Sequence, residues 1–111
     1  MPVPLHKDKL AERGFNQAEL IGEYISKKME IPMKNALARS RKTESQVKLS
    51  GDERRKNLES AFVCINKRAI LDKHILLVDD VTTTYSTLDE CAKELKSAGA
   101  KKIFGLVVAK G

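Results

Sequence analysis

The sequence contains little cysteine and no long hydrophobic run. Its 111 residues include only Cys64 and Cys91, which form no Cys-x-x-Cys pair, so neither a disulfide framework nor a zinc site is indicated. No apolar stretch approaches the roughly 18 residues that span a bilayer. Residues 1–6 also lack the apolar region of a signal peptide. We therefore expect a protein without membrane insertion, located in the cytoplasm.

Aromatic residues are also few, and none of the five stands among the clustered cations. This argues against a protein that binds single-stranded nucleic acid by stacking. The net charge is +6, and residues 39–56 hold seven cations against three acids. Two interpretations stay open for this stretch: a solvated loop and helix face, or an electrostatic trap for phosphate or nucleic acid. The cations are Arg39, Arg41, Lys42, Lys48, Arg54, Arg55 and Lys56.

The hydrophobic pattern predicts a single α/β domain over residues 1–111. The run Ile75–Val78 is typical of a central strand in a parallel sheet, and we expect further extended segments at 1–5, 35–39, 61–65 and 101–109. Helices are expected at about 16–30, 51–58 and 86–98, and a basic loop at 5–14. This alternation predicts a mostly parallel central sheet flanked by helices.

The most informative stretch follows the strand at Ile75–Val78. Asp79 and Asp80 come directly after the apolar run, and a series of threonine and serine residues follows them. Paired carboxylates can accept hydrogen bonds from the vicinal hydroxyls of a ribose, and backbone N–H groups and hydroxyls in a turn can hold a phosphate. Ser86 or Thr87 is expected to cap the next helix. The pattern predicts a sugar-phosphate site, and the acids could also bind Mg²⁺.

Residues 77–87, Leu-Val-Asp-Asp-Val-Thr-Thr-Thr-Tyr-Ser-Thr, resemble the phosphoribosyl pyrophosphate (PRPP) binding motif of type I phosphoribosyltransferases. Further segments resemble the ComF-type branch of that family, which is associated with competence for DNA uptake. The resemblance covers nearly the whole chain in order, so it implies a phosphoribosyltransferase-like fold for residues 1–111. These segments are Pro4-Leu5-His6, Arg13-Gly14-Phe15-Asn16-Gln17-Ala18, Thr43-Glu44-Ser45-Gln46, Leu49, Arg54-Arg55-Lys56-Asn57 and Ala61-Phe62.

The resemblance implies a role for each matching residue. Asp79 and Asp80 would bind the ribose hydroxyls and, largely through PRPP, the Mg²⁺ cofactor; with Arg13 they are the candidate catalytic residues. Tyr85 stands in the phosphate loop at the position that is usually glycine. The residues expected around the 5′-phosphate are Thr83, Thr84, Tyr85, Ser86 and Thr87, and those expected at the pyrophosphate or in a flexible closing loop are His6, Lys7, Arg13, Arg41, Lys42 and Gln46.

The implied activity is that of a glycosyltransferase of the pentosyltransferase class. Pyrophosphate would be displaced from the anomeric carbon of PRPP by an unidentified nitrogen acceptor, with Mg²⁺ and cations stabilising the leaving group. The alternative is a non-catalytic module that binds PRPP or a nucleotide, or that assists DNA uptake through residues 39–56. A homodimer, DNA and DNA-uptake proteins are further candidate partners.

Two departures from the family pattern carry expectations of their own. Glycine at the position of Tyr85 would permit a left-handed backbone, which costs another residue about 1–2 kcal/mol. The loop could take another path, the tyrosine hydroxyl could join the site, or phosphate binding could be impaired. The zinc segment and helical region that precede Pro4-Leu5-His6 in ComF-type chains are missing, so we expect an excised core or a naturally short form.

Overall fold

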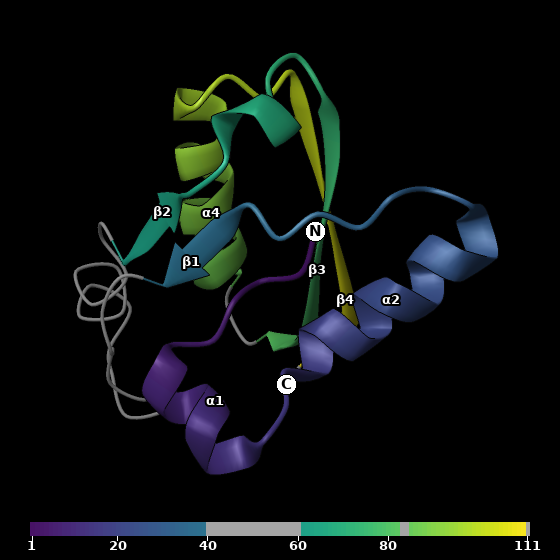
Figure 1. Cartoon of the computed structure of the whole chain (residues 1–111), viewed down its shortest axis with the longest axis vertical. Helices are drawn as coiled ribbons and strands as arrows, with labels where there is room; N and C mark the ends of the chain where they lie inside the picture. The colour runs from purple at the N-terminus through teal and green to yellow at the C-terminus, as the bar shows by residue number, and fades with distance from the viewer. Residues whose placement is uncertain (40–60, 83–84, 111) are drawn as a thin grey trace.

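The computed structural model describes residues 1–39, 61–82 and 85–110 (Figure 1). The predicted α/β class is confirmed, while the helix expected at about 51–58 lies outside these residues. Along the chain the elements are α1 (Lys7–Arg13), α2 (Gln17–Met29), β1 (Leu37–Arg39), β2 (Phe62–Cys64), the 3-10 helix η2 (Lys67–Ala69), β3 (His74–Thr82), α4 (Ser86–Ser97) and β4 (Lys102–Lys110).

β3 and β4 form a parallel pair joined through α4, with Leu77 opposite Gly105 in the register. The N-terminal segment lies along the other edge of β3. There Val3 N–H donates to the Val78 carbonyl at 2.9 Å, and Val78 N–H donates to the Met1 carbonyl at 2.9 Å. The strand expected at 1–5 is therefore present as an extended segment parallel to β3, although only Pro2 forms a bridge.

β1 and β2 form a separate antiparallel pair, in which Leu37 lies opposite Cys64 and Arg39 opposite Phe62. In the described residues, the prediction of a mostly parallel sheet therefore holds for β3 and β4 and is wrong for these two strands. Each is three residues long. Such a short apolar run indicates burial but carries no information about the direction of its partner.

The core lies on both faces of β3. Ile75 and Leu77 point to the face that packs against α4, whose Cys91 and Leu95 are fully buried. α2 lies against the other face, where Val78 is 1% exposed, and Figure 1 places the two helices on different sides of the strand. Burial on both faces explains why residues 75–78 are continuously apolar rather than alternating.

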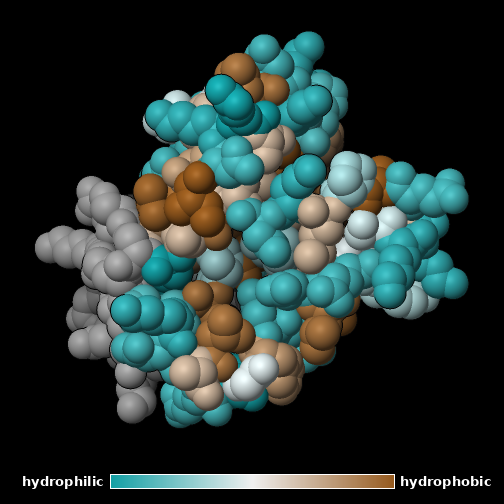
Figure 2. Space-filling view, in the orientation of Figure 1, coloured by the Kyte–Doolittle hydropathy of each residue, from teal (hydrophilic) through white to brown (hydrophobic). Residues whose placement is uncertain are grey.

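One face of the molecule is mainly hydrophilic. Figure 2 shows hydrophilic side chains over most of this face, with apolar side chains gathered in small groups. On β4, Phe104, Leu106 and Val108 share the α2 side of the sheet but remain exposed. Within the described part of the chain, every helix is too short or too polar to cross a bilayer.

α1 corrects the prediction of a basic loop at residues 5–14. His6 caps this helix, since its Nδ1 accepts the Asp8 N–H at 3.2 Å, and Gly14 ends it in a left-handed conformation (φ 81°) with its N–H on the Leu10 carbonyl at 2.7 Å. Asp8 in the first turn and Arg13 in the last complement the helix dipole. None of its residues is buried, so the sequence has no apolar periodicity here that would indicate a helix.

Candidate functional site

The carboxyl end of β3 brings together two of the segments that the sequence singled out. Asp79 and Asp80 follow Val78 in this strand, and Val3 pairs with Val78 in the parallel segment beside it. Because parallel strands end at the same edge of a sheet, the chain that leads from Val3 into α1 leaves beside the two acids. His6, the cap of α1, is half-buried three residues beyond Val3.

Asp79 is the most perturbed carboxylate of this edge. Its Oδ1 accepts the Asp80 N–H at 2.9 Å. Burial raises the pKa of Asp79 to about 6, with Asp80 contributing in both directions and the charge of Arg39 lowering it. At pH 7.5 the carboxyl is therefore mostly ionised and able to accept hydrogen bonds from ribose hydroxyls, whereas at pH 5 it is mostly protonated.

Arg39 is a site residue that the sequence did not single out beyond its place in a cation cluster. It lies opposite Phe62 in the β1–β2 register, and its guanidinium carbon stands over the Phe62 ring, 5.3 Å from the centroid. Its charge acts on Asp79 and also on the buried thiol of Cys91. Its position as the last residue of an extended segment, directly before a run of cations, is the signal that could have identified it.

Tyr85 adopts the left-handed conformation, with φ 61° and ψ 6°, immediately before α4. Tyr85, rather than Ser86 or Thr87, is thus the N-cap residue, and no side-chain cap hydrogen bond forms. Its carbonyl accepts the Asp89 N–H at 2.9 Å. At this residue the backbone has the left-handed conformation that glycine would allow. Because Thr83 and Thr84 of the same loop lie outside the described residues, all three alternatives raised by the sequence stay predictions.

The remaining phosphate-loop residues divide into two groups. Ser86 and Thr87 form the half-buried first turn of α4, directly after the turn at Tyr85. Thr83 and Thr84 lie outside the described residues. Beside Tyr85 is a cavity of about 270 Å³ between α4 and the β3–β4 pair, lined mainly by apolar side chains such as Leu77, Leu88 and Val107.

The structure separates two of the residues expected at the pyrophosphate. Lys7 and Arg13 are exposed at opposite ends of α1, about 9 Å apart along its axis for a rise of 1.5 Å per residue. They therefore present charge at two different points rather than one. The loop residues Arg41, Lys42 and Gln46 lie outside the described part of the chain.

Asn16 ties the segment that follows α1 to the central strands. Its Oδ1 accepts the Ala18 N–H at 3.0 Å and caps α2, which begins at Gln17, close to the start expected at about residue 16. Its Nδ2 also donates to the Val3 carbonyl at 3.1 Å, a contact that no local pattern could indicate. This side chain holds the turn after Arg13 against the same N-terminal segment that leads to His6.

The side chains at this edge suit a metal ion that is bound partly by the protein and partly by a ligand, rather than one bound by protein side chains alone. Among residues 1–39, 61–82 and 85–110, no group of three or more His, Cys, Asp or Glu side chains could hold a metal. Asp79 and Asp80 supply two carboxylates, which suits Mg²⁺ if a polyphosphate and water provide the other oxygens.

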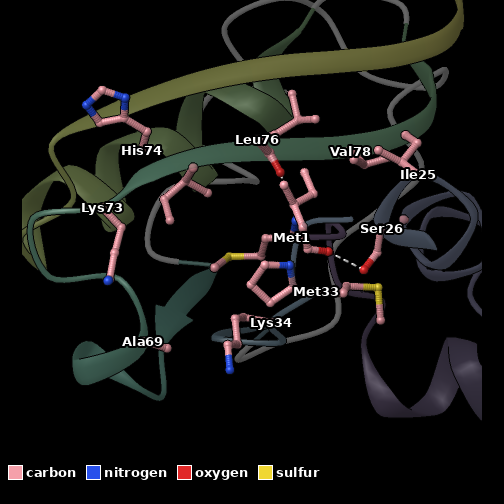
Figure 3. A pocket seen from close by; sticks show the side chains of 14 residues that line it. Met1, Ile25, Ser26, Met33, Lys34, Ala69, Lys73, His74, Leu76 and Val78 are labelled. Atoms are coloured by element: carbon pink, nitrogen blue, oxygen red, sulfur yellow. Dashed lines mark hydrogen bonds between the residues drawn. The ribbon is translucent and has the colours of Figure 1, made fainter. Parts of the chain in front are cut away.

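A larger cavity lies at the opposite end of β3 and is distinct from this edge. It encloses about 350 Å³ and is bounded by Met1, the middle of α2, residues 31–34 and the amino half of β3 (Figure 3). Its lining is mostly apolar, with Lys34 and Lys73 among the few charged residues. Its described lining residues include no carboxylate, so they offer neither a ribose nor a Mg²⁺ site of the predicted kind.

Comparison with known proteins gives several significant relatives. The chain is 39% identical over 105 residues to Competence protein F of Haemophilus influenzae, covering 93% of this chain and 46% of that protein. It is 35% identical to Competence protein ComFC of Streptococcus pneumoniae (95% of this chain, 46% of that protein) and 35% identical to DNA utilization protein YhgH of Escherichia coli K12 (91% and 44%). It spans less than half the length of these relatives. No family model and no solved structure matches.

Proposed function

From its membership of the ComF-type family of competence-associated proteins, we propose that the chain binds PRPP with Mg²⁺ at the carboxyl end of β3 and transfers its phosphoribosyl group to a nitrogen acceptor. The observation that carries this proposal is the left-handed backbone of Tyr85. Directly before α4, Tyr85 has the backbone conformation that the glycine usual at this position would allow, and such a conformation supports a turn that can hold a phosphate.

Asp79 and Asp80 are assigned to the ribose 2′ and 3′ hydroxyls. The Asp80 N–H already occupies one oxygen of Asp79, which fixes this carboxylate and leaves its other oxygen as an acceptor. Because burial raises the pKa of Asp79 to about 6, ribose binding is expected above that pH. Hydrogen bonds from two ribose hydroxyls would replace the hydrogen bonds to water that the ionised carboxylate loses on burial.

The first turn of α4 is assigned to the 5′-phosphate. Backbone N–H groups at a helix N-terminus have no partner within the helix, and the helix dipole favours an anion there. Ser86 and Thr87 contribute the hydroxyls of this turn, and Thr83 and Thr84 are proposed as further contacts. These groups bind the phosphate of substrate and product alike, so their role is positioning.

In the reaction, the lone pair of the acceptor nitrogen forms a bond to the anomeric carbon while the bond from that carbon to the pyrophosphate oxygen breaks. The electron pair leaves with pyrophosphate, and the acceptor loses its proton to solvent or to a base on the acceptor side. Mg²⁺, when bound, offsets the charge of the leaving group. His6, Lys7, Arg13, Arg41, Lys42 and Gln46 are the residues proposed to assist it, together with Arg39.

A second candidate function is that of an accessory module in DNA utilisation. The names of the relatives, which refer to competence and to DNA utilization, favour this link. The basic stretch 39–56 could contact nucleic-acid phosphates, in which case binding would weaken steeply as salt rises. A protein that binds PRPP without catalysing a reaction would agree both with the proposed PRPP site and with the names of the relatives.

Isothermal titration calorimetry with PRPP and Mg²⁺ tests the first step. Asp80→Asn is expected to weaken binding by about tenfold or more because it removes a charged acceptor, while Glu23→Gln, on the exposed part of α2, serves as the matched control. Absence of heat at millimolar PRPP would refute binding. If PRPP binds, pyrophosphate release with a panel of bases and amines separates an enzyme from a sensor, and DNA binding across salt tests the accessory role.

A further inference from the structure

Among the residues that the structure describes, the edge of β3 that faces away from β4 is paired over only part of its length. Leu76 carbonyl accepts the Met1 amino group at 2.8 Å, and Val78 pairs with Met1 and Val3 through its N–H and its carbonyl. In a parallel ladder the N–H and C=O of one residue point to the same side, and alternate residues face the same neighbour. The residues of β3 that face this edge are therefore His74, Leu76, Val78, Asp80 and Thr82, and His74 is the one that lies on the amino side of the stretch paired with Met1 and Val3.

The 350 Å³ cavity lies beside this same stretch. Figure 3 shows Met1 bonded to Leu76 at its centre, with Ile25 of α2 and Met33 across from it. At Gly22 a Cβ would lie 3.2 Å from the Met33 sulfur, so α2 and the segment after it close the groove there. The cavity thus has apolar walls and, along one side, the backbone edge of β3. On this edge the Leu76 N–H and the His74 carbonyl point toward the position that a residue ahead of Met1 would occupy in the parallel ladder.

We propose that this groove holds an extended polypeptide segment, which runs parallel to β3 in line with Met1–Val3 and belongs to the part of the longer family chains that these 111 residues do not cover. The relatives are more than twice as long as their aligned regions, which cover 44% to 46% of them. A strand satisfies both properties of the groove, because its backbone pairs with β3 while alternate side chains enter the cavity. A small apolar ligand would fill the walls but leave the β3 edge unpaired.

The charges around the groove specify the segment further. Lys34 and Lys73 are exposed residues of the lining, and none of its other described residues is an acid. The segment is therefore expected to carry β-branched residues at the positions that face Ile25 and Met33 and an acid near the two lysines. This inference does not rest on PRPP binding, since the groove lies at the other end of β3 from Asp79 and Asp80.

The test compares the 111-residue chain with two versions lengthened ahead of Met1 by five residues. One extension has a β-forming sequence, Glu-Val-Thr-Val-Thr, and the other is Gly-Ser-Gly-Ser-Gly. The first is expected to raise the Tm by about 4–8 °C over the second and to slow hydrogen exchange of the Leu76 amide by about tenfold or more. Equal Tm and equal Leu76 exchange in the two versions would overturn the proposal.

Variants on α2 provide the control for groove specificity. Ile25→Lys places a charge in the groove and is expected to abolish the gain from the β-forming extension. Leu20→Lys, on the exposed surface of the same helix, is expected to preserve it. If the Tm gain from the β-forming extension persists in Ile25→Lys, the extension binds outside the groove and the proposal fails. If an apolar dye binds the groove equally well with and without the extension, the natural occupant is a small molecule and the proposal fails.

Discussion

The guanidinium of Arg39 lies over the ring of Phe62, 5.3 Å from its centroid, and the two residues are direct partners in the β1–β2 ladder. Phe62 is 4% exposed and belongs to the core, so the ring is a fixed platform. A cation stacked in this way is worth about 0.5–2 kcal/mol and loses little freedom when it also meets an anion. The core of the protein thus positions a cation whose charge reaches Asp79.

We predict that Arg39→Gln lowers the affinity for Mg²⁺-pyrophosphate by about tenfold, because a charge-assisted contact of about 1.5–3 kcal/mol is lost. Arg68→Gln, an exposed arginine on η2, is the control and should leave the affinity unchanged. Arg39→Lys should recover only part of it, since lysine lacks the planar fork. Calorimetry that finds equal affinities for Arg39→Gln and Arg68→Gln would remove Arg39 from the site.

The pKa of Asp79 leads to a prediction about stability. Its folded pKa of about 6 exceeds the ordinary value of 3.8, so the folded state binds this proton more tightly than the unfolded state. The contribution of Asp79 to the free energy of unfolding is therefore favourable at low pH and is lost as pH rises from about 4 to 6. Asp79→Asn removes the ionisation and with it this loss of stability at higher pH. The amide oxygen of the asparagine can still accept the Asp80 N–H.

Asp79→Asn should thus be more stable than the unmodified protein at pH 7.5, by about 1–2 kcal/mol once solvent screening of a half-buried carboxyl is allowed for. The advantage should shrink toward pH 4. Urea unfolding of both proteins at several pH values measures it. A difference that does not change between pH 4 and pH 7.5 would contradict the raised pKa.

The elements that the sequence predicted are those whose burial leaves a long pattern. The apolar run Ile75–Val78 lies in β3, and the helix expected at about 86–98 is α4, whose Leu88, Cys91 and Leu95 are buried at a spacing of three and four residues. α1 has no buried residue and β1 and β2 have three residues each, so neither the helix nor the antiparallel pairing left such a signal.

The candidate site rests on signals of the same local kind. The acid pair and the hydroxyl-rich run are contiguous in the sequence, which is why one stretch indicates both, and the structure places Asp79 and Asp80 in the carboxyl half of β3. The stacking of Arg39 on Phe62 and the bond from Asn16 to Val3 join residues 23 and 13 positions apart, respectively. Such contacts depend on tertiary packing, so a single sequence does not indicate them.

Tyr85 offers a direct test of backbone strain in the phosphate turn. Its left-handed conformation costs a residue with a Cβ about 1–2 kcal/mol, and glycine avoids that cost. Tyr85→Gly should raise the free energy of unfolding by about 1 kcal/mol and retain or improve PRPP binding. Tyr85→Ala, which keeps the Cβ, should give no such gain. If both variants bind PRPP more weakly by the same factor, the tyrosine side chain is itself a ligand contact.

The two cysteines should differ sharply in reactivity. Cys91 is 0% exposed in the core, and burial raises the pKa of its thiol far above the ordinary value, so thiolate is scarce in the folded state. Cys64 is only partly buried at the end of β2. A thiol reagent at pH 8 should modify one cysteine per chain quickly and the second only in denaturant. Rapid modification of Cys91 in the native protein would contradict the packing of α4 against β3.

Asn16 makes two contacts that substitutions can separate. Asn16→Asp keeps the oxygen that caps α2 but replaces the Nδ2 donor to the Val3 carbonyl with an acceptor, which repels it. Asn16→Ala removes both contacts and should lower the free energy of unfolding by about 2 kcal/mol, one for the cap and one for the lost bond. Asn16→Asp should lower the free energy of unfolding by at least the share that comes from the bond to Val3, while α2 keeps its helicity. Chemical denaturation with circular dichroism measures both, and an unchanged stability for Asn16→Asp would show that the bond to Val3 contributes nothing.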